Sequence, residues 1–178
     1  MIYIFLANGF EETEALVPLD ILRRAKIEVK TVGIGGNTIV GSHGISVNCD
    51  TVNKDLSFVN LDGIILPGGL PGATNLEADK TVQEAIDYCS QNNLLISAIC
   101  AAPQILGHKG LLNGKNAVCF PGFEKELKGA KICDQKVVRD GNIITAWGAG
   151  AAFEFGFEIL GYLTDTETAE KMQESMKY

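Results

Sequence analysis

Cys100 follows an apolar stretch at residues 94–99 and comes directly before Ala-Ala-Pro at residues 101–103. The stretch has the length of a buried strand, and Pro103 is tolerated in the first turn of a helix but not in its interior. A cysteine on such a turn corresponds to a nucleophile elbow, and the N-terminus of the next helix favours a thiolate. We expect a reactive thiol at Cys100; the alternative is a buried, inert cysteine.

A catalytic thiol also needs hydrogen-bond donors for a developing oxyanion. Gly68 and Gly69 follow Pro67 at the end of another apolar stretch, residues 61–66. Glycine allows backbone N–H groups to approach a substrate closely, so both N–H groups are candidate donors. The competing interpretation of these residues is a plain turn.

The same thiol needs a group that carries a proton. Glu11, Glu12 and Glu14 are the acidic candidates, and one of them, held neutral beside Cys100, would act as a general acid and base. The residues alone do not choose among the three, and we expect the other two to be solvated.

Histidine is a common partner of a catalytic cysteine, and the chain has two. His108 follows Cys100 by about two helical turns, so it is expected to point away from the elbow. His43 is expected at the tip of a hairpin, without a partner in its own chain. It would reach a site only from a second subunit; otherwise it is a surface histidine.

The elements that position these residues follow from hydrophobic periodicity and turn signals. Helix 11–24 contains Pro18, which is expected to kink the helix or shift its start. Expected strands are 2–7, 30–34, 61–66, 94–99 and 116–120, with hairpins 38–40/45–47 and 131–138/142–147; the other expected helices are 75–93, 104–108, 151–163 and one from residue 166.

Strands that alternate with helices predict an α/β sandwich with a mostly parallel sheet. No linker or repeat interrupts the chain, so we expect a single domain over residues 1–178. Ligands of such sheets bind beyond the carboxyl ends of the strands. Loops 8–14, 67–72 and 100–103 should therefore converge on one site.

The composition limits the compartment and the partners. The chain has 178 residues, of which 46% are hydrophobic and 21% charged, and its net charge is −7 without a basic run. This pattern argues against nucleic-acid and membrane partners. No signal peptide or membrane span is recognisable, so a cytoplasmic protein is expected. Five cysteines without a C-x-x-C pair predict free thiols, with core positions for all but Cys100.

Three motifs in order resemble the ThiJ/PfpI superfamily: NGFEETE at residues 8–14, LPGG at 66–69 and AICAAP at 98–103. The branch they resemble is that of DJ-1 and the bacterial ThiJ-like proteins, and residues 23–25, 42–45 and 148–155 are also similar to it. The resemblance covers essentially the whole chain. It implies a flavodoxin-like three-layer sandwich with helices on both faces, one class I glutamine-amidotransferase-like domain, and a homodimer.

The resemblance also implies roles for individual residues. Cys100 would be the reactive cysteine and Glu14 the protonated carboxyl that touches its sulfur. Gly68, Gly69 and Ala101 would supply oxyanion-side backbone groups. The resemblance implies no cofactor and no metal.

The implied activity is glyoxalase or deglycase chemistry on small reactive aldehydes of the methylglyoxal class and on their adducts. The alternative is a redox-sensing, chaperone-like stress protein whose Cys100 oxidises to a sulfinate. A further alternative is the thiazole-monophosphate-biosynthesis label that some ThiJ homologues carry.

Two departures from the family's pattern, at Phe120 and Ala101, and two further features bear on the expected activity. Phe120 precedes Pro121 where several members have His, which removes a general base and disfavours vigorous hydrolysis. Ala101 stands where the peptidase branch has His, so a peptidase is disfavoured. No downstream His-x-Glu is present, which disfavours an amidotransferase. Trp147 occupies a region where relatives have Arg, so the polarity of the substrate pocket is expected to differ.

Overall fold

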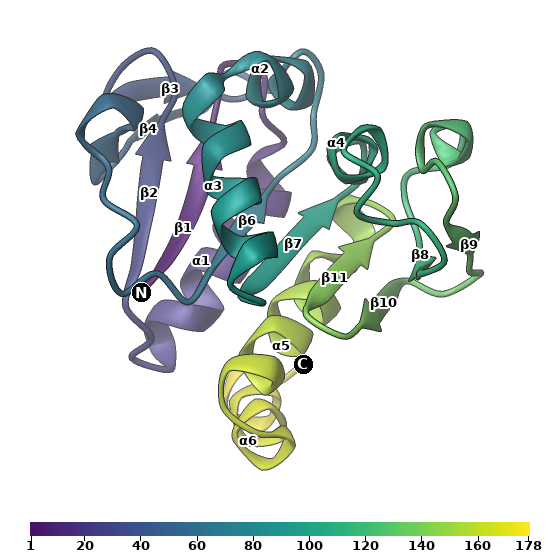
Figure 1. Ribbon diagram of the computed structural model, residues 1–178. Coiled ribbons are helices and arrows are strands. Elements are labelled where there is room, and N and C mark those ends of the chain that lie inside the picture. Colours follow the sequence, from purple (N-terminus) through teal and green to yellow (C-terminus); the bar gives the residue numbers. More distant parts are fainter.

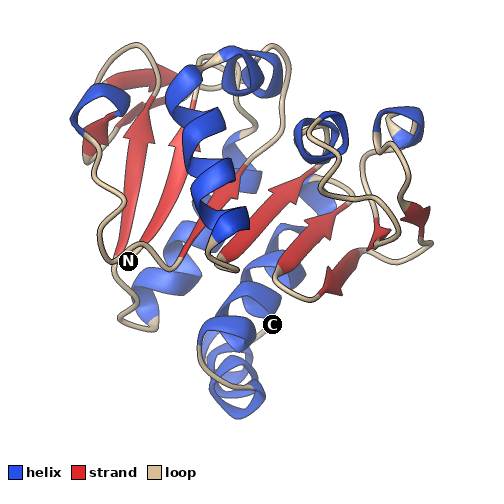
Figure 2. Ribbon diagram, viewed as in Figure 1, coloured by secondary structure: helices blue, strands red, loops and turns tan.

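A computed structural model describes residues 1–178 and shows a central sheet flanked by helices (Figures 1 and 2). The strands are β1 (Ile2–Leu6), β2 (Val29–Gly33), β3 (Thr38–Val40), β4 (Ser46–Asn48), β5 (Thr51–Val52), β6 (Gly63–Leu66), β7 (Leu95–Ile99), β8 (Asn116–Ala117), β9 (Lys131–Ile132), β10 (Val137–Asp140) and β11 (Ile143–Ala146). The α-helices are α1 (Glu12–Arg24), α2 (Gly72–Ala78), α3 (Lys80–Gln91), α4 (Pro103–His108), α5 (Ala152–Leu163) and α6 (Thr166–Met176); short 3-10 turns are η1 (Asn53–Asp55), η2 (Glu124–Glu126) and η3 (Ala149–Ala151).

The main sheet has seven strands in the order β10-β11-β7-β6-β1-β2-β5. All neighbouring pairs are parallel except β10 and β11, which form an antiparallel hairpin at one edge. The predicted α/β fold with a mostly parallel sheet is therefore confirmed. The Asp140-Gly141 hairpin is also as predicted, with Gly141 at a φ of +66° that favours glycine.

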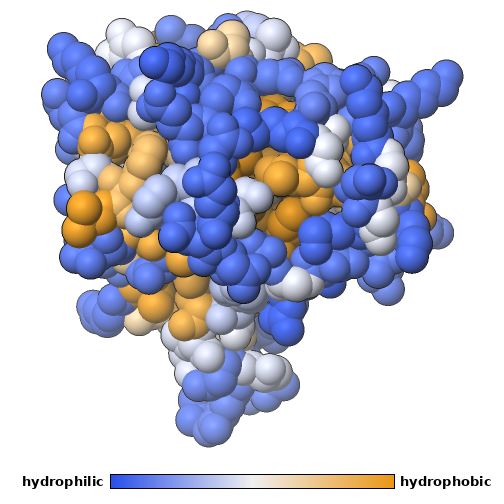
Figure 3. Space-filling view, viewed as in Figure 1, coloured by the Kyte–Doolittle hydropathy of each residue, from blue (hydrophilic) through white to orange (hydrophobic).

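Two hydrophobic cores lie on opposite faces of this sheet, because side chains alternate along a strand. In β1, Ile2, Ile4 and Leu6 point into the core that α1, α5 and α6 cover. Tyr3 and Phe5 point into the other core, which α2, α3 and α4 cover. The apolar run at residues 2–6 is continuous because both faces of β1 are buried, as in other parallel sheets. In the view of Figure 1 the molecular surface is mostly hydrophilic, with apolar side chains visible in a central hollow (Figure 3).

The helix expected over residues 75–93 is two helices, α2 and α3. Asp79 separates them with an extended backbone conformation, and its side chain accepts a hydrogen bond from the Val82 N–H at 3.1 Å. An aspartate with this geometry is an N-cap, which starts a new helix even where the apolar spacing continues. The periodicity of apolar residues continues across Asp79, so it did not predict this break.

Two expected strands are shorter than predicted. Only Asn116–Ala117 of residues 116–120 pairs as a strand, since the Val118 N–H donates to Thr145 Oγ1 instead. Residues 131–138 divide into β9, which pairs with β8 in a small separate sheet, and β10 in the main sheet.

Helix α1 begins at Glu12 and continues through Pro18, so the proline does not set its start. No helix is long and apolar enough to span a membrane.

The three predicted loops meet at the carboxyl ends of β1, β6 and β7. The Glu11 N–H donates to the Gly68 carbonyl at 3.0 Å, and the Gly72 N–H donates to the Gly9 carbonyl at 3.2 Å. The Gly68 N–H reaches the Glu14 carboxyl, and Gly68 lies against Cys100. These contacts join the loops after all three strands at one place.

Candidate active site

Cys100 occupies the sharp turn between β7 and α4. Its φ of +65° lies in the left-handed region, which is uncommon for a residue other than glycine. The Cys100 N–H donates to the Ala146 carbonyl at 2.9 Å, and its own carbonyl accepts from the Phe120 N–H at 2.9 Å. These two hydrogen bonds hold the strained backbone in the conformation of a nucleophile elbow. The thiol is free and partly exposed.

Glu14 is the carboxyl that meets this thiol. Its side chain comes from the first turn of α1, is 1% exposed and forms a hydrogen bond with Cys100. Its Oε2 accepts the Gly68 N–H at 2.9 Å, and the Ala149 N–H also donates to the carboxyl. Burial raises the pKa of Glu14 to about 7, although these hydrogen bonds lower it. The structure thus distinguishes Glu14 from the two neighbouring glutamates.

Gly68 fits between the two reactive groups only because it has no side chain. A Cβ there would lie 2.6 Å from the Cys100 Cβ and 2.7 Å from Glu14 Oε2. Its N–H donates to Glu14 in this structure, so the role of Gly68 as an oxyanion donor stays a prediction. Here Gly68 orients the carboxyl, because one backbone N–H donates to one acceptor at this geometry.

Gly69 and Ala101 present backbone N–H groups to the Cys100 sulfur. Gly69 adopts a φ of +85°, and a Cβ there would lie 2.4 Å from the Glu11 backbone nitrogen. Only glycine therefore allows the loop to approach so closely. The two N–H groups are suited to hold a negative charge on the sulfur or on an oxygen attached next to it.

Burial raises the pKa of the Cys100 thiol to about 12, and the ionised Glu14 carboxylate raises it further. The N–H groups of Gly69 and Ala101 lower this pKa, but burial outweighs them. Burial and the adjacent acidic group therefore oppose the lowered pKa that the elbow predicts for the Cys100 thiol. The two protons are coupled: a protonated Glu14 no longer repels the thiolate and can donate a hydrogen bond to it.

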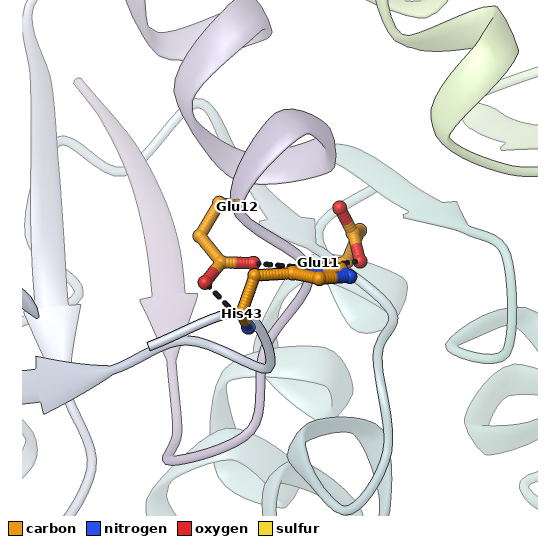
Figure 4. Close-up of side chains that lie close together, drawn as sticks. All are labelled: Glu11, Glu12 and His43. Carbon is orange, nitrogen blue, oxygen red and sulfur yellow. Dashed lines mark hydrogen bonds and ion pairs between the residues drawn. The ribbon is translucent and has the colours of Figure 1, made fainter. Parts of the chain in front are cut away.

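Glu12 is buried rather than solvated, contrary to the sequence-based expectation. It is 5% exposed, and its Oε1 accepts the His43 N–H at 2.8 Å. Its Oε2 lies 2.9 Å from His43 Nδ1 (Figure 4) and 3.3 Å from Ser42 Oγ. These hydrogen bonds lower the pKa of Glu12 to about 2 against the opposing effect of burial. Glu12 thus fastens the tip of the β3–β4 hairpin to the start of α1.

His43 has a partner in its own chain, which corrects the expectation that it has none. The hydrogen bond with Glu12 and the charge of Glu11 raise the pKa of His43, which lies on the surface. One ligand atom each from Glu11, Glu12 and His43 lies within 4.8 Å of the others, so these side chains could hold a metal ion. The positive N-terminal end of α1 opposes a cation there. A metal-free function stays a prediction.

The remaining histidine lies away from the thiol, as expected. His108 Nε2 is 2.8 Å from Glu126 Oε2, and its Nδ1 is 2.5 Å from Glu77 Oε1. His108 therefore links α4 to α2 and η2, and no histidine contacts Cys100. Cys133 was predicted to fill the core, but it is partly exposed.

Sequence reasoning missed Ala149, whose N–H reaches the Glu14 carboxyl from a loop far along the chain. The glycines on both sides of Ala149 mark a loop that can approach another segment closely, which was the only signal. This loop follows β11, the neighbour of β7 in the sheet.

The fold and the site together define a class: an α/β protein with a cysteine elbow, a buried carboxyl against the thiol, and donor N–H groups around the sulfur. The sequence matches the DJ-1/PfpI family over residues 1–161, and the chain belongs to this family.

Two relatives illustrate the match along the sequence. The chain is 32% identical to Protein dj-1beta of Drosophila melanogaster over 176 residues, which cover 97% of this chain and 94% of that protein. It is 34% identical to the Parkinson disease protein 7 homolog of Danio rerio over 175 residues, which cover 96% and 93%.

Solved structures agree with the fold. A cysteine-to-alanine mutant of a DJ-1 superfamily protein from Salmonella typhimurium is 33% identical and superposes with a TM-score of 0.94, covering 99% of this chain and 97% of the other. Oxidized Toxoplasma gondii DJ-1 is 29% identical, with a TM-score of 0.95 and the same coverage. The chain is therefore a DJ-1-like protein with a flavodoxin-like sandwich.

Proposed function

We propose that this protein is a cytoplasmic, cofactor-free stress enzyme that converts small 2-oxoaldehydes of the methylglyoxal class, or their adducts, through Cys100 and Glu14. One observation carries the proposal: Glu14, with a pKa raised to about 7, is hydrogen-bonded to the thiol on the elbow. A general base is most effective when its pKa lies near the working pH. The high pKa of the thiol makes such a base necessary.

In the first step Glu14 accepts the thiol proton while the sulfur forms a bond to the aldehyde carbon. The electron pair of the C=O bond moves to oxygen, beside the N–H groups of Gly69 and Ala101. Protonation of that oxygen gives a hemithioacetal. This use of Glu14 as base and then acid requires only the hydrogen bond that already joins it to Cys100.

In the second step a proton leaves the former aldehyde carbon and the neighbouring carbonyl carbon gains one. The hemithioacetal thereby becomes the thioester of a 2-hydroxy acid: one carbon is oxidised and the other reduced, so no external oxidant is needed. Water then cleaves the thioester, which releases the acid and restores the thiol. We assign to Glu14 the transfer of the proton in each of these steps.

The test compares Cys100→Ser with Cys133→Ser, since both cysteines are partly exposed. We expect Cys100→Ser to lose at least about 100-fold in formation of lactate from methylglyoxal, because the residue forms the covalent intermediate. Cys133→Ser should retain the wild-type rate. Equal turnover by Cys100→Ser and the wild type would show that the proposed mechanism is wrong.

A second candidate function is redox sensing with chaperone-like behaviour. The partly exposed Cys100 sulfur, surrounded by the N–H groups of Gly69 and Ala101, favours this function because the same donors would hold the oxygens of a sulfinate. Limiting peroxide followed by peptide mass spectrometry should then modify Cys100 before any other cysteine. Earlier oxidation of Cys49 or Cys119 would contradict it.

We also propose a homodimer and no nucleic-acid or membrane partner. The resemblance to the ThiJ/PfpI superfamily supports the first of these, and the net charge of −7 supports the second. Light scattering at micromolar concentration should give twice the chain mass of 19.1 kDa. A monomeric mass would contradict the dimer.

A further inference from the structure

A pocket of about 350 Å³ adjoins the elbow. Phe120, Pro121 and Trp147 line it together with the backbone at residues 148–150. No charged side chain lines this pocket, whereas four other pockets of the surface each include at least one acidic residue. The pocket therefore suits an uncharged, apolar group.

Both walls of the pocket are tied to Cys100. The Phe120 N–H donates to the Cys100 carbonyl, and the Cys100 N–H donates to the carbonyl of Ala146, which directly precedes Trp147. Ala149 belongs to the pocket and also donates its N–H to Glu14. A molecule bound covalently at the sulfur would therefore have this pocket beside it.

The two aromatic side chains of the pocket have no aromatic partner within the chain. Phe120 is 47% exposed, and none of the aromatic ring pairs of the protein involves Phe120 or Trp147. The Phe120 ring lies over Gly148, where an added Cβ would be 3.1 Å from Phe120 Cδ2. The ring face that remains free is available to a ligand ring, which prefers an offset-stacked or edge-to-face arrangement.

We propose that this pocket binds the organic substituent of the substrate, and that the preferred substrates are 2-oxoaldehydes that carry an aromatic ring. This inference rests on the proposed function for its chemistry, but the pocket can be tested separately. Burial of a ring against Phe120 and Trp147 stabilises the bound substrate and the transition state, whereas a methyl group fills little of the space.

The experiment measures kcat/KM for phenylglyoxal and for methylglyoxal and uses their ratio, which cancels effects common to both substrates. Trp147→Ala and Phe120→Ala should each lower the ratio at least about 10-fold relative to the wild type, the range in which a hydrophobic pocket discriminates. Trp147→Phe should lower it less. Phe153→Ala is the matched control, because Phe153 is an exposed ring outside the pocket, and should leave the ratio unchanged.

A second measurement is independent of turnover. Alkylation of Cys100 by N-phenyl iodoacetamide is compared with alkylation by iodoacetamide, and the same variants should lower this ratio. If the aldehydes are converted but neither ratio changes in Trp147→Ala and Phe120→Ala, the pocket proposal is overturned while the proposed function stands. If neither aldehyde is converted but the alkylation ratio falls, the proposed function fails and the aromatic subsite stands.

Discussion

Replacement of Glu14 by glutamine should change how the stability of the fold depends on pH. Burial raises the pKa of Glu14 from 4.5 to about 7 in the folded protein, whereas the unfolded chain returns it to the ordinary value. Between these two values the folded protein holds a proton that the unfolded chain has lost. The contribution of Glu14 to the stability of the fold is therefore fully present below pH 4.5 and is lost as the pH rises through about 7.

The size of this loss follows from the same two pKa values. Each pKa unit corresponds to 1.36 kcal/mol, so the rise to about 7 corresponds to a loss of about 3 kcal/mol. Glutamine cannot ionise, and Glu14→Gln should lack this part of the pH dependence. Glutamine also offers a single acceptor oxygen to the N–H groups of Gly68 and Ala149, but that cost does not change with pH.

The assay is urea unfolding of the wild type and of Glu14→Gln at several pH values from 4.5 to 8. The difference between their free energies of unfolding should move by about 3 kcal/mol in favour of Glu14→Gln as the pH rises. Glu14→Met, which also cannot ionise, should show the same slope. A difference that stays constant over this range would refute the assignment of Glu14 as a buried carboxyl with a raised pKa.

Three further predictions concern Gly68 and Glu12, which position the site and the hairpin beside it, and the N-cap of α3. Gly68→Ala places a Cβ 2.6 Å from that of Cys100, so it should cost about 1–3 kcal/mol in urea unfolding and slow alkylation of Cys100; wild-type values for both would contradict the close approach. Glu12→Gln should destabilise the protein by about 1–3 kcal/mol at pH 7. The loss should be smaller as the pH falls toward 2, because the stability that a lowered pKa contributes is lost on acidification. Amide hydrogen exchange at residues 41–45 should become faster, and unchanged exchange would contradict the role of Glu12. Asp79→Ala removes the N-cap of α3 and should cost about 1 kcal/mol in thermal unfolding, whereas Asp79→Asn should cost less; equal losses would contradict capping.

Much of the architecture could be predicted because local chemistry and global fold agree. The continuous apolar runs of β1, β6 and β7 have the pattern of strands buried on both faces. The Asp140-Gly141 turn predicted the only antiparallel pair of the main sheet. The predictions failed where one side chain or one hydrogen bond overrides a pattern, as at Asp79, which divides a helix whose apolar spacing continues across it.

The candidate site was predicted in part for a similar reason. The elbow at Cys100 and the glycines at residues 68–69 are visible as motifs, since both place special backbone geometry within a few residues. The contribution of Ala149 has no local signature, because it depends on a loop that folding brings against Glu14. The partner of His43 was missed for the same reason, since Glu12 lies 31 residues earlier in the chain.

The sequence by itself determined which chemical groups are available: one cysteine on a strand-to-helix turn, a glycine pair after a strand, and three glutamates at the start of a helix. Only the tertiary structure decided what each glutamate does. Glu14 is turned toward Gly68 and Cys100 at the carboxyl ends of β6 and β7, where burial raises its pKa, and Glu12 is turned toward the hairpin, where hydrogen bonds lower its pKa. The pKa of a carboxyl depends on its solvation and on its hydrogen-bond partners, and both are set by residues distant in the chain.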